Sequence, residues 1–204
     1  MKPETGNKPI QAQNKVSIQL SLDGHSFSPS PLPERAGGED GVWVELISPR
    51  TMLVPESLFD PQTGRELLAA NGTPATADER IVCSEVREGA VAVMPVAGEV
   101  LQQIEAKYPA NIRFTSPLLH RPAESGKCVW MARWGKVLYI KIYREGVLLL
   151  AEAIEAETDD DLRYFVERLN GTFPLAEFEL RAAGEEAGKL RKRIGKIFAR
   201  AICE

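Results

Sequence analysis

The 204-residue sequence predicts an α/β fold, chiefly from the segment between Cys128 and Ala156. Three β-rich runs follow one another in this segment, separated by Trp-Gly and Glu-Gly turn signals. An acidic helix cap at 158–161 comes directly afterwards, and another short strand is predicted at 178–181. A three-strand meander followed by a helix and a strand indicates a mixed β-sheet with a helix packed against it.

The middle run of this meander predicts a strand in the interior of the sheet. Its residues alternate onto two faces, with Val137, Tyr139 and Lys141 on one and Leu138, Ile140 and Ile142 on the other. Because both faces carry apolar groups, we expect the sheet to be covered on both sides.

The helix after the meander begins with a cap formed by Thr158 and the three aspartates that follow it. Its apolar positions have the spacing of one helix face: Leu162, Phe165, Val166 and Leu169. We expect Asn170-Gly171 to end it. Since acidic residues are favourable at a helix start, Asp159 to Asp161 are interpreted as capping residues rather than as a metal cluster.

The first part of the chain predicts a second set of strands and helices. Residues 1–14 are expected to be a disordered arm, and a strand with alternating apolar residues then runs from Val16 to the hairpin signal Asp23-Gly24. After a Pro- and Gly-rich loop, the predicted elements are strands at 42–48 and 52–54, a helical piece at 65–70, strands at 80–86 and 90–94, a helix opened by Pro95 and closed at Tyr108-Pro109, and a strand at 112–115.

The two parts share an order of elements, namely a hairpin, a third strand, a helix and another strand, but no repeated residue motif. We therefore expect a first half at 15–122, with an inserted αββα region near 55–110, and a second half at 123–204. The second half is expected to end in a basic helix that starts at Glu185.

Four segments resemble a family of uncharacterised bacterial proteins in the actin-like ATPase superfamily. They are Ile18–Phe27, Met52–Asp60, Val91–Leu119, and the meander together with the helix DDDLRYFV. The resemblance covers most of the chain from residue 16 onward. It implies an actin-like ATPase fold, built from two ribonuclease-H-like halves with mixed β-sheets flanked by helices, and it implies no established activity.

The superfamily binds ATP through short loops that follow strands, and the first two loops match only in part. The first requires Asp-x-Gly, whereas Gly24 follows Asp23 directly, so a plain hairpin turn is the leading interpretation. The second requires another carboxylate in the turn after the first strand of the second half. Arg133, Trp134 and Lys136 stand around that turn instead. Cations can hold phosphate, but they cannot ligate Mg²⁺.

The third loop, for adenosine, requires small residues after a late strand, and Ala183 and Gly184 satisfy this before a predicted helix whose N–H groups could bind an anion. These partial matches favour a pseudo-ATPase with no catalytic residues, no metal and no cofactor. The alternative is a protein that binds ATP with Mg²⁺ through Asp23, Gly24, Ala183 and Gly184.

Other chemistries find no support in the sequence. The two histidines, His25 and His120, are far apart and lack metal-ligand spacing. There is no nucleophile elbow, Walker loop or dinucleotide fingerprint. A ribonuclease-H nuclease needs carboxylates on its central strands, where this chain has apolar or basic residues.

Two surfaces are candidates for interaction. The basic helix at the C-terminal end carries Arg191, Lys192 and Arg193, and it could pack its apolar stripe on the sheet, bind RNA or an acidic protein, or attach to an anionic membrane. The Arg133–Lys136 turn offers an exposed Trp134 between cations, whereas Trp43 and Trp130 are expected in the core.

Composition favours the cytoplasm. The net charge is −4, no apolar run approaches the roughly 20 residues of a membrane span, and no signal peptide is evident. Cys83, Cys128 and Cys203 lie far apart without a CxxC pattern, which indicates free thiols. The leading hypothesis is a non-catalytic cytoplasmic interaction or scaffold protein with an unidentified protein partner. Nucleic acid is a less favoured partner, and the oligomeric state is left open.

Overall fold

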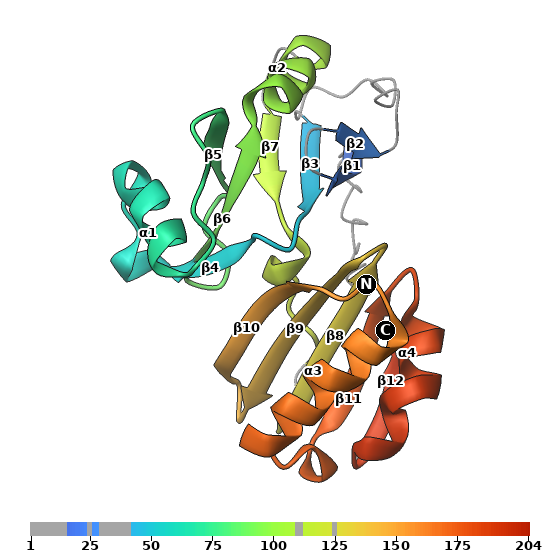
Figure 1. The fold of residues 1–204 in the computed structure, drawn as a ribbon. Coiled ribbons are helices and arrows are strands. Elements are labelled where there is room, and N and C mark those ends of the chain that lie inside the picture. The colour runs from blue at the N-terminus through green and yellow to red at the C-terminus, as the bar shows by residue number, and fades with distance from the viewer. Residues whose placement is uncertain (1–15, 24–25, 29–41, 109–111, 124–125) are drawn as a thin grey trace, which may run out of the picture.

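The structure, a computed structural model, describes residues 16–23, 26–28, 42–108, 112–123 and 126–204. The predicted arm at 1–14, Gly24, His25 and the whole Pro- and Gly-rich loop at 29–41 lie outside these residues. Two β-sheets form the centres of an N-terminal half (up to residue 123) and a C-terminal half (from residue 126), and a third, smaller sheet flanks the first (Figure 1). None of the helices described is both long and apolar enough to cross a membrane.

The sheet of the C-terminal half has the strand order β10-β9-β8-β11-β12. The strands are β8 (Lys127–Trp134), β9 (Val137–Arg144), β10 (Val147–Glu155), β11 (Glu179–Gly184) and β12 (Arg200–Cys203). The first three form the predicted antiparallel meander, and β11 pairs parallel to both β8 and β12. Glu145 and Gly146 join β9 to β10 with positive φ angles of 50° and 77°, as a two-residue type I′ turn requires.

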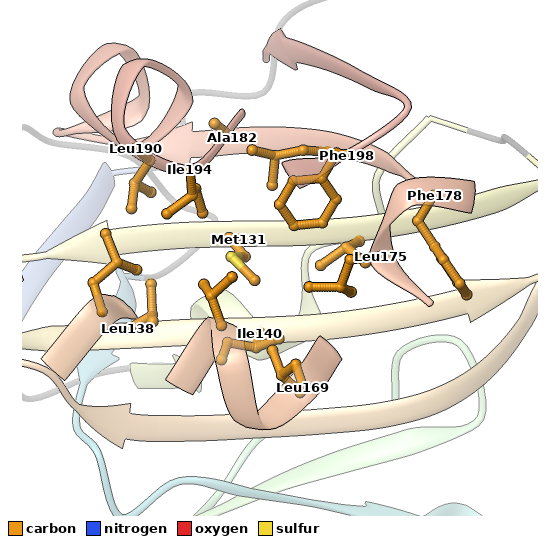
Figure 2. Packing of buried hydrophobic residues seen from close by; sticks show 14 of the residues in the cluster. Met131, Leu138, Ile140, Leu169, Leu175, Phe178, Ala182, Leu190, Ile194 and Phe198 are labelled. Carbon is orange, nitrogen blue, oxygen red and sulfur yellow. The ribbon is translucent and has the colours of Figure 1, made fainter. Parts of the chain in front are cut away.

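One face of this sheet packs against α3 (Asp159–Thr172) and α4 (Ala187–Ile194). Figure 2 shows Met131, Leu138 and Ile140 of the strands facing side chains of both helices. The helices contribute Leu162, Val166, Leu169, Leu190 and Ile194 to this cluster. Each large apolar side chain that is fully buried stabilises the fold by about 1.5–3 kcal/mol, so these residues hold both helices on the sheet.

The predicted start of α3 is confirmed and its predicted end is wrong. Thr158 and Asp161 form a capping box, in which each side chain bonds the other residue's backbone N–H. Asn170 and Gly171 do not end the helix, which continues to Thr172. The chain leaves the helix at Phe173, which has an extended backbone and donates its N–H to the Leu169 carbonyl.

The sheet of the N-terminal half has the order β2-β1-β3-β7, formed by β1 (Val16–Asp23), β2 (Ser26–Ser28), β3 (Val42–Ile47) and β7 (Ile112–Thr115). Here the third strand does not extend a meander. It pairs parallel to β1 on the side opposite β2, and β7 pairs parallel to β3. The two halves therefore share an order of elements along the chain but differ in how the third strand is placed.

A three-stranded antiparallel sheet, β4-β6-β5, stands between β3 and β7 in sequence. It comprises β4 (Met52–Pro55), β5 (Glu79–Cys83) and β6 (Ala90–Ala97), with α1 (Gly64–Ala70) and α2 (Gly98–Lys107) attached. Pro95 was expected to open the helix, but it lies inside β6. The pairing of β4 with β6 ends at Val93, so at Pro95 the strand has a neighbour on one side only and a missing N–H is tolerated.

The basic C-terminal helix is shorter than the sequence predicted. α4 ends at Ile194, a single 3₁₀ turn follows, and the chain then forms β12 beside β11. Phe198 lies between the helix and the strand and is buried in the same cluster as Leu190 and Ile194. Insertion of this ring into the core turns the chain back toward the sheet edge.

The other face of the C-terminal sheet packs against the N-terminal half. Ile47 at the end of β3 and Leu118 in the 3₁₀ turn after β7 belong to a buried cluster with Trp130, Val137 and Tyr139. The predicted burial of Trp43 and Trp130 and the predicted two-sided covering of β9 are confirmed.

Candidate functional site

The first predicted phosphate loop lies mostly outside the described residues. Asp23 ends β1 and pairs with Ser26 of β2, as a tight hairpin requires. Gly24 is not among the residues described, and the position of the Asp23 side chain is not described either. The assignment of ATP to these two residues therefore stays a prediction.

The turn expected to be the second phosphate loop is built around a buried arginine. Arg133 is only 9% exposed. Its guanidinium donates to the carbonyl oxygens of Gly135 at 3.2 Å, Ala156 at 2.9 Å and Glu157 at 2.8 Å. It also forms an ion pair with Glu186 at 3.4 Å. Arg133 thus joins the β8–β9 turn to the end of β10 and to the start of α4.

The other two residues of this turn are more accessible. Trp134 is half-buried, and its ring meets the ring of Tyr139 edge-on with 5.7 Å between centroids. Lys136 is exposed and forms an ion pair with Glu157 at 2.8 Å. Of the predicted interaction residues in this turn, Lys136 alone is exposed, whereas Arg133 faces inward.

Ala183 and Gly184, the predicted adenosine loop, are the last two residues of β11. Gly184 has a φ of +82°, and a Cβ added there would lie 2.7 Å from the Arg133 carbonyl oxygen. Glycine is therefore required so that β11 can approach the backbone of β8 closely. The packing of β11 against β8 therefore accounts for the glycine at this position, and no ligand is needed to explain it.

The N-terminus of α4 already has a carboxylate beside it. Glu186, the residue before the helix, pairs with both Arg133 and Lys189. The hydrogen bond from Lys189 is the main reason why the pKa of Glu186 lies below its ordinary value. An anionic ligand at this helix start would be repelled by the ionised side chain.

The basic residues of α4 lie on its outer side. Leu190 and Ile194 are buried against the sheet, so the helix is docked on the core. Arg191 and Lys192 are exposed, and Arg193 forms an ion pair with Asp159 at the start of α3. Exposed cations therefore remain available on a helix that is fixed in place.

A hollow of about 450 Å³ lies between the two halves. It is lined by Ser48, Pro49, Arg50, Glu79, Pro95, Val96, Ala97, Lys136, Val137 and Glu155. Within it, Arg50 donates two hydrogen bonds to Glu79, at 2.5 and 3.0 Å. Burial by itself would raise the pKa of Glu79. The hydrogen bonds from Arg50 and Thr76 together outweigh this effect, so the pKa lies below its ordinary value and the carboxyl is ionised near neutrality.

This cleft brings together one residue that the sequence indicated and two that it did not. Lys136 comes from the predicted second loop, whereas Arg50 comes from the turn between β3 and β4 and Glu79 from the start of β5. Nothing in the local pattern around Pro49-Arg50 distinguishes it from an ordinary turn. Within the part of the chain that the structure describes, no group of three or more His, Cys, Asp or Glu side chains could hold a metal ion.

Comparison with known proteins places the fold. No family model and no curated protein sequence matches the chain. Among solved structures, a Bacteroides thetaiotaomicron protein with an actin-like ATPase fold and unknown function superposes with a TM-score of 0.72 at 18% identity, covering 93% of this chain and 90% of that one. The cytoplasmic domain of EpsL, an inner membrane component of the Vibrio cholerae type II secretion system, superposes with a TM-score of 0.43 at 12% identity, covering 83% and 82%. The chain therefore has the actin-like ATPase fold, as the resemblance implied.

Proposed function

We propose that this protein is a non-catalytic cytoplasmic interaction or scaffold protein, a pseudo-ATPase on an actin-like fold. The observation that supports this most directly is the position of Arg133. The superfamily resemblance requires a carboxylate at this turn to position hydrated metal. Here a guanidinium occupies the turn and bonds three main-chain carbonyls.

This arrangement opposes metal binding in two ways. A guanidinium has only donor N–H groups, so it cannot ligate Mg²⁺. Two of its hydrogen bonds are also directed at the backbone that follows β10, so moving it aside would leave the buried Ala156 carbonyl without that donor. The residue therefore stabilises the corner in which nucleotide phosphates would otherwise lie.

An exposed apolar edge supports the interaction role. Val147, Leu148 and Leu149 of β10 are 60%, 40% and 41% exposed. β10 is an outer strand of the five-stranded sheet. Three consecutive apolar side chains on an edge strand are a surface that a protein partner can cover.

The expected absence of nucleotide binding is tested by a thermal-shift titration with Mg-ATP, Mg-ADP and Mg-GTP at millimolar concentration. A ligand at 100 times its Kd stabilises a one-site protein by about 2.7 kcal/mol, which shifts the Tm by several degrees at this chain length. We expect no shift. A shift that Asp23→Ala abolishes would overturn the scaffold proposal in favour of nucleotide binding through Asp23.

The interaction surface is tested by quantitative pull-down with the variant Val147→Lys/Leu149→Lys. A partner that covers β10 should be lost from this variant and retained by Leu58→Lys, because Leu58 is an apolar residue that is 70% exposed outside the edge. Equal recovery of every partner by all three proteins would contradict a role for β10.

Nucleotide binding without turnover is the second candidate, and the cleft between the halves favours it. Lys136 and Arg50 line this cleft, and both could face a phosphate. In that case Lys136→Glu should abolish a nucleotide-dependent Tm shift, whereas Lys189→Glu on α4 should preserve it.

RNA association through α4 is the third candidate, supported by the exposure of Arg191 and Lys192. It would appear as binding that weakens steeply with added salt and is lost in Arg191→Glu/Lys192→Glu. Salt-independent binding, or binding that survives this charge reversal, would exclude the helix as the RNA surface.

A further inference from the structure

Lys141 is a buried amine that faces two aromatic rings. It lies in the middle of β9, directly opposite Trp130 of β8, and the residue is 1% exposed. Its Nζ stands 4.8 Å from the centroid of the Trp130 ring and 5.8 Å from that of Tyr143. It makes no hydrogen bond or ion pair with the residues that the structure describes. Buried ammonium groups are ordinarily paired, so this one needs an explanation.

Burial disfavours the charged form of this amine. Desolvation lowers the pKa of Lys141 from 10.5 to about 7, while the nearby Cys128, Glu204 and Glu88 raise it and Arg121 lowers it. At neutral pH a substantial fraction of the amine is therefore unprotonated, whereas an ordinary lysine with a pKa near 10.4 is almost entirely protonated. The unprotonated amine has a free lone pair and is a nucleophile.

The amine lines a pocket of about 210 Å³ at the junction of the two halves. Leu53 comes from β4, Leu118 from the 3₁₀ turn after β7, and Leu148 from β10, so the walls are largely apolar. Because Lys141 is covered while the charged lining residues are exposed, the amine stands at the floor and the charges at the mouth. This pocket is separate from the Arg50–Lys136 cleft, and the two share no lining residue.

The mouth of the pocket is positively charged. Arg121 and Glu88 form an ion pair there, and Arg87 lies on the same rim and also stacks on Trp43 at 4.9 Å. Two arginines and one glutamate leave a net positive charge at the entrance. A small ligand with a carboxylate matches this charge, and an apolar carbon skeleton matches the walls.

We propose that Lys141 is a reactive amine that binds a small carbonyl compound carrying a carboxylate, of the 2-oxo acid class, as an imine. The Nζ lone pair attacks the carbonyl carbon, so that a C–N bond forms and the C=O π bond breaks with its electron pair moving to oxygen. A proton then passes from the nitrogen to this oxygen, which becomes a hydroxyl. The carbinolamine then loses this hydroxyl with a proton from nitrogen as water, which leaves a C=N bond. No oxidant or reductant takes part, and the step is reversible.

This inference goes beyond the pseudo-ATPase proposal and does not depend on it. It needs no nucleotide, and its residues lie outside the Arg133 corner. A protein that binds ATP could still hold an imine at Lys141, and a scaffold protein could use such a ligand to stabilise the junction between its halves.

The test is reductive trapping at pH 7. The protein is incubated with glyoxylate and cyanoborohydride, which converts an imine into a stable secondary amine, and the modified lysines are identified by peptide mass spectrometry. We expect Lys141 to be labelled at least about tenfold more than Lys192, an exposed lysine of α4 that serves as the reference. The preference should shrink at pH 10, where about a quarter of the amines of exposed lysines are also unprotonated.

Two controls separate the parts of the proposal. Propanal, an aldehyde without a carboxylate, should show a smaller preference for Lys141, and Arg121→Gln should lower the preference for glyoxylate but not for propanal. Lys141→Met should remove the labelled peptide while its circular dichroism and melting remain those of a folded protein. Labelling of Lys141 that does not exceed that of Lys192 at pH 7 would overturn the reactive amine. Equal preference for glyoxylate and propanal would overturn the carboxylate site.

Discussion

The phenol of Tyr139 joins the two halves of the molecule by bonding the backbone of Ser48. Its oxygen accepts a hydrogen bond from the Ser48 N–H at 2.8 Å and lies 3.4 Å from the Ser48 carbonyl oxygen, to which it donates. The two residues are 91 positions apart in the chain, and both are buried. One side chain of β9 thus provides hydrogen bonds to both backbone polar groups of the residue that follows β3.

Tyr139→Phe should destabilise the protein because it leaves the buried Ser48 N–H without an acceptor. Such a loss costs about 1–3 kcal/mol, or a fall in Tm of about 2–4 °C for each kcal/mol in a chain of this size. Thermal and urea unfolding measure the effect. Tyr164→Phe is the matched control, since Tyr164 is 60% exposed, and it should unfold like the wild type.

The same phenol predicts a loss of stability in alkali. Burial raises the pKa of Tyr139 above its ordinary value of 10, so the folded protein keeps the proton after the unfolded chain has lost it. The unfolded state then binds fewer protons, and stability falls as the pH rises above about 10. Urea unfolding between pH 9 and 11.5 should show a steeper decline for the wild type than for Tyr139→Phe. Parallel curves would contradict this.

Gly184→Ala should be strongly destabilising, by about 2 kcal/mol or more, because the added Cβ meets the Arg133 carbonyl oxygen at 2.7 Å and the φ of +82° disfavours alanine. Gly188→Ala provides the comparison. Nothing lies within 4 Å of an added Cβ there, and alanine favours the helix, so this change should be neutral or stabilising by up to about 1 kcal/mol. Equilibrium unfolding of both variants measures the two changes in stability. Equal losses would show that replacing any glycine destabilises the protein, rather than the close contact between Gly184 and the Arg133 backbone.

Arg133→Met should destabilise the fold by about 2–4 kcal/mol, because it removes the donor to the buried Ala156 carbonyl and leaves Glu186 with one partner fewer. Arg133→Lys should not restore the stability, since a single ammonium cannot reach three carbonyls in a fixed fork geometry. If the lysine variant were as stable in urea as the wild type, a positive charge alone, rather than the hydrogen-bond geometry of the guanidinium, would be what stabilises this turn.

Lys141→Met should stabilise the protein, and the gain should depend on pH. In the wild type the folded pKa of about 7 lies below the unfolded value of 10.5, so between these pH values the unfolded state binds more protons and wild-type stability rises with pH. The difference between the variant and the wild type should therefore be largest below pH 7 and decline toward pH 10, at up to about 1.4 kcal/mol per pH unit. Urea unfolding at pH 6, 8 and 10 measures it. A gain that is constant across this range would mean that Lys141 is charged in the folded state.

Local sequence patterns predicted the parts of the fold that depend on local chemistry. The alternation along 137–142 identified an interior strand, and Thr158 with Asp161 identified a helix start, because the residues that make up each signal lie within a few positions of one another. The fate of Pro95 could not be predicted in this way. Whether a proline is tolerated in β6 depends on where β4 stops pairing, and that is fixed by a separate segment of the chain.

The candidate sites show the same limit more strongly. The sequence placed Arg133 in the correct turn, but its three carbonyl partners and Glu186 come partly from segments more than 20 residues away, so its burial was not visible. Lys141 was placed on the correct face of β9. Its burial, however, results from the N-terminal half covering that face, and the spacing of residues within the strand does not predict this contact.

The central strand β9 also determines how the protein unfolds. Leu138 and Ile140 belong to the core beneath α3 and α4, while Val137 and Tyr139 belong to the core shared with the N-terminal half. Loss of either core would leave one face of the same strand bare, so neither half can melt without weakening the other. The cooperative unit is therefore the pair of halves, and calorimetry should record one transition in which the calorimetric and van't Hoff enthalpies agree.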